Sequence, residues 1–94
     1  MATVVVGDFE WDEKKAAANE RKHGVTFVEA ITAFLDERGI AAPDCDHPGR
    51  FVLIGMSRAL RVLFVVSAES GERVRLISAR KASPTQRKMY ENGP

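Results

Sequence analysis

The stretch that decides the fold is RVRLISARK, residues 73–81, which is typical of a β-strand that ends in a basic pair. Because side chains alternate between the two faces of a strand, residues 74, 76, 78 and 80 share one face and the odd-numbered residues share the other. Each face carries at least one guanidinium beside aliphatic carbons. The mixture fits a sheet face that presents cations in its middle. It fits equally well a solvated edge strand whose arginine stems lie on apolar neighbours.

Two more strands are predicted just before this stretch. Residues 50–56 hold a continuous apolar run, and residues 60–68 are apolar on both faces, as expected of a central strand covered on both sides. The connections are short, so the three segments are expected to form an antiparallel meander. Residues 40–42 are a candidate fourth strand. Residues 3–6 are either a first strand or a loosely held arm.

Helix signals precede and follow the predicted strands. Asp12 is a good N-cap for a helix that runs to about Lys22, and Gly24 is a suitable left-handed stop. A capping-box pattern at residues 26–29 opens a second helix that ends near residues 36–38. Its apolar stripe, predicted to face the core, comprises Phe27, Ala30, Ile31, Phe34 and Leu35. A third helix opens at residues 83–86, again with a capping box and with proline at its first position.

These elements predict an α+β fold with two N-terminal helices, an antiparallel sheet of three to four strands and a C-terminal helix. The chain has 94 residues, so we expect a single domain over residues 1–94. No apolar run approaches the roughly 20 residues of a membrane span, and the N-terminus lacks a signal pattern. The single cysteine, Cys45, excludes an internal disulfide. We therefore expect a cytoplasmic protein with no membrane partner.

The net charge of +1 hides an asymmetry between the two halves of the chain. Residues 1–47 hold five bases and ten acids, a net charge of −5, whereas residues 48–94 hold nine bases and three acids, a net charge of +6. Seven of those nine bases are arginine, whose planar fork suits bidentate phosphate contacts. A basic half in a near-neutral protein indicates a local anionic partner, most commonly nucleic acid.

The candidate site residues fit RNA chemistry better than metal chemistry. Lys15, Asn19 and Lys22 share one face of the first helix, with His23 at its edge. They form either an anion site or a solvated basic helix end. Cleaving RNA without metal requires a base for the 2′-hydroxyl, a cationic cradle for the phosphorane and an acid for the leaving 5′-oxygen. The available bases are His23, His47 and Glu69, and arginines supply the cradle.

We expect neither metal nor cofactor. Asp44, Cys45, Asp46 and His47 lie together in a loop, but their spacing matches no ligand motif. The chain contains no glycine-rich phosphate loop and no nucleophile elbow.

The sequence resembles the BrnT toxin family over about residues 9–91. In the first half the residues that carry the resemblance are FEWD (9–12), Lys15, Asn19, KHGV (22–25) and Phe27. In the second half they are IGMS (54–57), RVL (61–63), ISARKA (77–82) and Tyr90. The KHGV and ISARKA pieces, in this order and separation, are specific together, whereas either alone is weak.

The resemblance implies a RelE-like toxin domain and a function. It implies an endoribonuclease toxin of a type II toxin–antitoxin pair, which inhibits translation and is neutralised by a cognate antitoxin. RNA would be the substrate, and operator DNA would be contacted only through the antitoxin. We predict catalytic roles for His23, Arg61, Arg80 and Lys22. We predict RNA-binding roles for Lys15, Arg50, Arg75, Lys81 and Arg87.

Two positions depart from the family pattern. Family members often carry glutamate two residues before the equivalent of Arg50, where this chain has Pro48. The strand that holds residues 65 and 66 usually continues into tyrosine or histidine, where this chain has Ser67. If either family residue is a catalytic acid or base, this chain is weakly active or uses His47 or Glu69 instead. The alternative function is a non-catalytic RNA- or protein-binding module, a degenerate toxin. A homodimer and a toxin–antitoxin hetero-oligomer both stay open.

Overall fold

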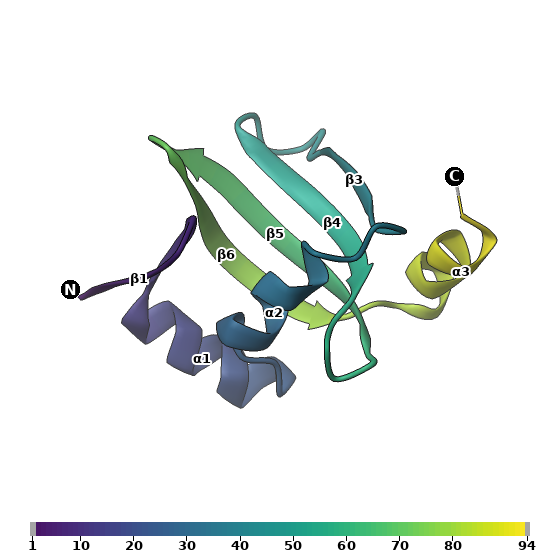
Figure 1. The fold of residues 1–94 in the computed structure, drawn as a ribbon, viewed down its shortest axis with the longest axis horizontal. Helices are drawn as coiled ribbons and strands as arrows, with labels where there is room; N and C mark the ends of the chain where they lie inside the picture. The colour runs from purple at the N-terminus through teal and green to yellow at the C-terminus, as the bar shows by residue number, and fades with distance from the viewer. Residues whose placement is uncertain (1, 94) are drawn as a thin grey trace.

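The computed structural model describes residues 2–93, which form three helices and one six-stranded sheet (Figure 1). The elements in chain order are β1 (Thr3–Val6), β2 (Phe9–Asp12), α1 (Glu13–His23), α2 (Phe27–Ala33), β3 (Ile40–Pro43), β4 (Arg50–Met56), β5 (Val62–Ser70), β6 (Arg73–Lys81) and α3 (Pro84–Asn92). The strand order is β1-β2-β6-β5-β4-β3. Neighbouring strands are antiparallel except β2 and β6, which are parallel.

The predicted fold class is wrong, because the sheet is larger and mixed, and because a hairpin precedes the two helices. β1 and β2 turn on Gly7, which adopts a left-handed φ of 58°, and β2 then pairs in parallel with β6. That pairing is anchored by a hydrogen bond from Arg75 Nη1 to Glu10 Oε2, between residues 65 positions apart. Local sequence patterns carry no information about a partner at this distance. For this reason the sequence patterns predict no strand at Phe9–Asp12.

The predicted meander of β4, β5 and β6 is confirmed, and its register places alternate residues on opposite faces of the sheet. One face packs against α1 and α2 and holds the main core. This core comprises Trp11, Val25, Phe27, Ala30, Ala33, Leu53, Leu63, Val65, Leu76 and Ala79. The backbone of α2 approaches β4 closely: a Cβ on Gly55 would lie 2.9 Å from the carbonyl oxygen of Ala33.

The opposite face is covered at one end only. There α3 packs its buried Tyr90 against Ile54, Val62 and Ala82 in a second, smaller core. The remainder, which we call the open face, carries half-buried side chains from three strands. These are Arg50, Val52, Val66, Ala68, Arg75, Ser78 and Arg80. Figure 1 shows α1 and α2 together on one side of the strands and α3 beyond the end of β6.

The second helix is shorter than predicted. α2 ends at Ala33, and the chain continues through three i→i−3 hydrogen bonds to Asp36. Leu35, predicted to belong to the apolar stripe, is therefore 77% exposed. Only half of the predicted capping box forms: Thr26 Oγ1 accepts from the Glu29 backbone N–H, but the Glu29 carboxylate binds elsewhere. No helix among residues 2–93 is long and apolar enough to span a membrane.

Candidate nucleic-acid interface

Arg80 is held on the open face by three contacts that leave half of its guanidinium free. Its Cζ lies 4.5 Å from the centroid of the Phe64 ring, within cation–π range. Its Nη1 donates to the carbonyl oxygen of Lys81 and to Gln86 Oε1, each at 3.0 Å. Among residues 2–93, Nε and Nη2 find no hydrogen-bond acceptor. This Nε–Nη2 edge is the side of a guanidinium that binds a phosphate or carboxylate through two parallel hydrogen bonds.

Arg61 has the opposite arrangement, because the same edge is already occupied. Its Nε donates to Glu29 Oε2 at 2.9 Å, and its Nη2 donates to Glu29 Oε1 and, at 3.1 Å, to the carbonyl oxygen of Gly24. Ser57 Oγ donates to the same carboxylate at 2.6 Å. Arg61 thereby ties the segment before β5 to α2 and to the C-cap of α1. It lies on the helix-covered side of the sheet, not on the open face with Arg80.

The charges of this pair stabilise one another. The hydrogen bond from Arg61 lowers the pKa of Glu29 below its ordinary value; burial opposes the shift, while Ser57 and the positive charge of Lys81 assist it. The hydrogen bond to Glu29 likewise raises the pKa of Arg61. Both groups remain ionised at neutral pH, so the positive charge of Arg61 is largely neutralised where it lies.

The remaining arginines of the open face lie farther along the sheet. Arg50 and Arg75 flank Ala68 in register, four residues from Phe64 along β5, and thus about 13 Å from the Arg80 row. Arg75 pairs with Glu10 at 2.6 Å, and Ser70 Oγ also donates to that carboxylate at 3.2 Å. Arg50 makes no ion pair with any residue in the 2–93 range. Of these two, Arg50 is the cation without a countercharge.

A groove between α1 and β6 brings three predicted residues to the edge of the open face. The groove has a volume of about 230 Å³ and is lined by Lys15, Lys22 and His23 on the α1 side and by Ile77 and Ser78 on the β6 side. Ser78 precedes Arg80 by two residues on the same face of β6, a separation of about 7 Å. The predicted basic helix face is thus continuous with the surface around Arg80.

Asn19 lines the same groove, and its side chain is hydrogen-bonded within the fold. It is buried, and its side-chain amide donates to the carbonyl oxygens of Val25 and Ala79 at 2.9 and 2.8 Å. Its Oδ1 accepts from the Ala79 N–H at 3.1 Å. The amide thus substitutes for a neighbouring strand on the free edge of β6. An asparagine on a basic helix face gave no local signal of this contact, which joins residues 60 positions apart.

The other predicted residues are spread over the surface. Lys81 and Arg87 are exposed, with Lys81 on the Glu29 side and Arg87 on α3. The Nδ1 of His47 lies 3.3 Å from Asp44 Oδ2 in the β3–β4 loop. Ser67 and Glu69 line an apolar groove of about 240 Å³ with Phe51. By strand alternation Ser67 faces the helix-covered side, so its departure from the family pattern lies away from Arg80.

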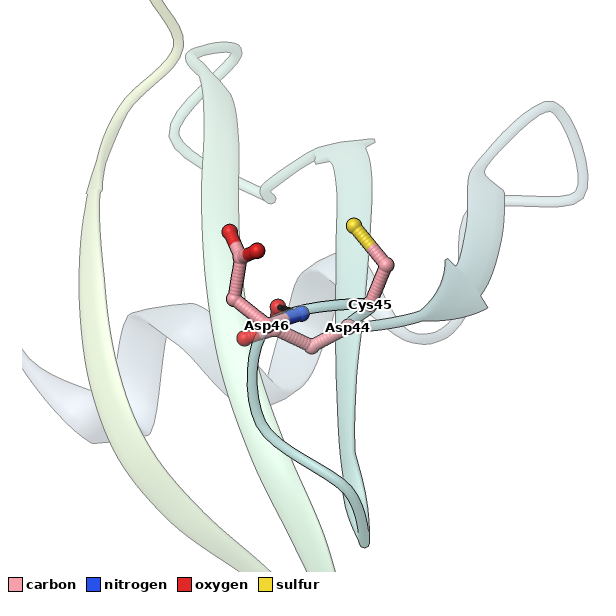
Figure 2. A group of neighbouring side chains, drawn as sticks. All are labelled: Asp44, Cys45 and Asp46. Carbon is pink, nitrogen blue, oxygen red and sulfur yellow. Dashed lines mark hydrogen bonds between the residues drawn. The ribbon is translucent and has the colours of Figure 1, made fainter.

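The acidic loop holds the candidate metal ligands. Figure 2 shows Asp44, Cys45 and Asp46 as consecutive residues, and one ligand atom from each lies within 4.8 Å of the others. Asp44 is already engaged, because its Oδ1 accepts from the Asp46 N–H at 3.0 Å and its Oδ2 faces His47. Cys45 and Asp46 are exposed. The cluster has the form of a hydrogen-bonded turn on the surface.

Sequence reasoning missed Gln86 as a partner of Arg80. The capping-box pattern explained Gln86 fully, since its Oε1 accepts from the Ser83 N–H at 2.9 Å and its N–H donates to Ser83 Oγ at 3.2 Å. The additional bond to Arg80 depends on how the chain turns between β6 and α3. Its only sequence signal was proximity, with the two residues six positions apart.

Comparison with known proteins assigns the chain to a family. The family model for the ribonuclease toxin BrnT of type II toxin–antitoxin systems matches residues 11–86. Among solved structures, the chain is similar to a 1.1 Å crystal structure of the Brucella abortus ribonuclease toxin BrnT, with 28% sequence identity and a TM-score of 0.65. The match covers 78% of this chain and 92% of the Brucella chain. No curated protein matches the sequence. The protein is therefore a member of the BrnT family of type II ribonuclease toxins, a membership that implies a cognate antitoxin.

Proposed function

We propose that this chain is a cytoplasmic endoribonuclease that cleaves RNA without metal, inhibits translation and is neutralised by a DNA-binding antitoxin. The observation that carries the proposal is the free Nε–Nη2 edge of Arg80 on an otherwise uncovered sheet face. A phosphodiester seated on this edge would receive two charge-assisted hydrogen bonds. Family membership supplies the reaction class, and the geometry supports the choice of residue.

The contrast between two arginines refines the predicted catalytic set. Arg80 keeps a free Nε–Nη2 edge and its positive charge. In Arg61, Glu29 binds the same edge and neutralises the charge. We therefore assign Arg80 to the phosphate cradle. We assign Arg61 the supporting task of holding the α1–α2 corner in place. Arg50, which has no ion pair within residues 2–93, would contact the RNA backbone farther along the open face, and Lys81, which also has none there, would contact it at the end of β6.

The reaction that this cradle fits is an internal transesterification. A base removes the proton of the 2′-hydroxyl, the 2′-oxygen forms a bond to phosphorus, and the bond from phosphorus to the 5′-oxygen breaks. An acid returns a proton to the leaving 5′-oxygen. The products are a 2′,3′-cyclic phosphate and a 5′-hydroxyl. Arg80 would stabilise the charge that develops on the non-bridging oxygens of the phosphorane.

Among the three candidate bases, His23 is the best placed. It lines the groove that ends at Ser78, which is about 7 Å along β6 from Arg80. His47 is in the β3–β4 loop, and Glu69 lies three residues beyond the middle of β5 on the helix-covered side. A strand of RNA that crosses the β6 edge would contact Lys15 and Lys22 beside His23. We propose His23 as the base and Lys22 as a phosphate contact.

One observation favours the alternative of a binding module without catalysis. Within residues 2–93, Arg80 is hydrogen-bonded only to Lys81 and Gln86, and no candidate base touches it. A surface built in this way can hold RNA, or an acidic segment of a partner protein, without cleaving anything. An antitoxin segment rich in acidic residues would cover the same cations that RNA uses.

The deciding experiment is an RNA cleavage assay with EDTA present, using the wild type, Arg80→Ala and the matched control Lys88→Ala. Lys88 is exposed on α3 and belongs to no predicted site. We expect cleavage by the wild type and the control, and a loss of at least about 100-fold for Arg80→Ala. RNA binding without cleavage by the wild type would replace the enzyme by the binding module. Equal activity of Arg80→Ala and Lys88→Ala would remove Arg80 from the cradle.

A further inference from the structure

We propose that Gln86 is a positioning residue of the ribonuclease site, which orients the free edge of Arg80 without neutralising its charge. The inference rests on the proposed function and extends it to α3. It comes from a feature of the hydrogen-bond network rather than from a sequence motif. The amide oxygen of Gln86 is shared between the helix cap and the arginine of the cradle.

The rotation of the Arg80 guanidinium depends on Gln86. The Arg80 Cζ lies 4.5 Å from the centroid of the Phe64 ring, but a cation–π contact has no directional acceptor and leaves the guanidinium free to turn. Two oxygens accept hydrogen bonds from Nη1, each at 3.0 Å, and they prevent this rotation because they hold Nη1 in place. One acceptor is a backbone carbonyl, which no side-chain change removes. The other is Gln86, and it alone ties the fork to α3.

The chemical type of the acceptor matters as much as its position. Glu29 holds Arg61 through a carboxylate, which satisfies the fork and cancels its charge. Gln86 holds Arg80 through a neutral amide oxygen, which fixes direction and leaves the positive charge available to a phosphate. Arg61 and Arg80 are thus each held by a side-chain acceptor, a carboxylate for Arg61 and an amide for Arg80. Only the one anchored by an amide can still bind an anion strongly.

Gln86 is itself fixed before any ligand arrives. Its Oε1 accepts from the Ser83 N–H, and its own N–H donates to Ser83 Oγ, which completes the capping box of α3. The helix start therefore serves as a rigid support for Arg80. The cap can be weakened while Gln86 Oε1 keeps both of its donors, Arg80 and the Ser83 N–H. A role in the cap alone and a role in positioning Arg80 therefore predict different rates of cleavage.

The experiment compares Gln86→Leu with Ser83→Ala. Gln86→Leu removes the acceptor for Arg80, whereas Ser83→Ala removes the cap oxygen and leaves Gln86 Oε1 in place. Single-turnover cleavage is measured at saturating protein, and affinity is measured with a fully 2′-O-methylated copy of the RNA. We expect Gln86→Leu to cleave at least about tenfold more slowly, with affinity within about threefold, because misorientation acts on the reacting geometry. Ser83→Ala should keep the wild-type rate within about threefold.

A second variant tests the charge argument and keeps the capping box intact. Gln86→Glu retains an oxygen at the same place, so α3 still forms, but it adds a carboxylate beside Arg80. The control is Thr85→Glu, which adds the same charge one residue earlier on the exposed side of α3. We expect Gln86→Glu to weaken RNA binding about tenfold more than Thr85→Glu, because only the former neutralises the cradle.

Each outcome decides between the two proposals. If the wild type cleaves RNA and Gln86→Leu is no slower than Ser83→Ala, the positioning role is refuted and the ribonuclease stands. Equal binding by Gln86→Glu and Thr85→Glu would likewise refute the charge argument. A wild type that cleaves no RNA would overturn the proposed function together with the role of Gln86 in it.

Discussion

Breaking the pair of Glu29 and Arg61 is expected to destabilise the fold rather than to remove a phosphate contact. Glu29→Gln keeps the size of the side chain but removes its charge, and it leaves Arg61 without a countercharge on the helix-covered side. The pair joins two segments 32 residues apart, so the loss affects the packing of α2 against the sheet. Loss of this pair should therefore lower the free energy of unfolding.

The size of the effect follows from the burial of the pair. The side chains of Arg61 and Glu29 are 31% and 15% exposed, so the pair is neither fully exposed nor fully buried. Exposed ion pairs contribute at most about 1 kcal/mol, whereas hydrogen bonds to charged groups contribute about 1.5–3 kcal/mol. We expect a loss of about 2 kcal/mol. For a domain of 94 residues this corresponds to a fall in Tm of about 10 °C.

The pH dependence of this loss has a definite sign. The pKa of Glu29 is lowered in the folded state from its ordinary value of 4.5, mainly by the hydrogen bond from Arg61. A carboxylate of this kind stabilises the fold above its unfolded pKa, and the contribution disappears as the pH falls through the lower folded pKa. The difference between the wild type and Glu29→Gln should be full at pH 7 and shrink below pH 4.5.

Urea unfolding followed by circular dichroism, from pH 7 down to pH 3, measures this difference. The control is Glu37→Gln, which removes an exposed carboxylate that forms no ion pair within residues 2–93. A double-mutant cycle with Arg61→Met should show a coupling energy of about 1 kcal/mol or more. Additive effects, or a destabilisation that persists unchanged at low pH, would refute the reasoning.

Three further predictions concern residues that hold the sheet together. Asn19→Ala should lower the free energy of unfolding by about 2–4 kcal/mol in urea, because it leaves the N–H and carbonyl of Ala79 unpaired at a buried edge. Tyr90→Phe should lower the free energy of unfolding by about 1–2 kcal/mol, because it removes the hydrogen bond from the Tyr90 hydroxyl to Asp36. The same variant should raise the pKa of Asp36 in an NMR titration. Burial raises this pKa, and the hydrogen bond from Tyr90 is the largest of those that bring it below its ordinary value. Gly55→Ala should cost about 1–3 kcal/mol by thermal unfolding, since its Cβ would meet a backbone oxygen of α2 at 2.9 Å.

Much of the local structure was predictable because it depends on neighbours in the chain. Asp12, Thr26 and Ser83 cap the three helices as predicted, since each N-cap oxygen accepts from a backbone N–H three residues later. The meander of β4, β5 and β6 followed from short turns between strand-like segments. The basic character of the second half of the chain was also visible in composition alone.

The roles of the signature residues needed the three-dimensional structure. Trp11, Asn19 and Phe27 carry the resemblance to the family, and all three are buried in the fold. Gly24 is the left-handed C-cap of α1. A motif is a list of positions, and its residue types do not distinguish a residue that holds the fold from one that contacts a substrate.

By itself, the sequence determined the helix starts, the three-stranded meander and the presence of a basic surface, because these depend on contacts within a few residues or on composition. Only the tertiary structure decided that β2 pairs in parallel with β6 and that Glu29 occupies Arg61 while Arg80 keeps a free edge. The physical reason is distance along the chain. Arg61 and Arg80 differ in what their guanidinium groups leave free because one folds against a carboxylate and the other against an amide.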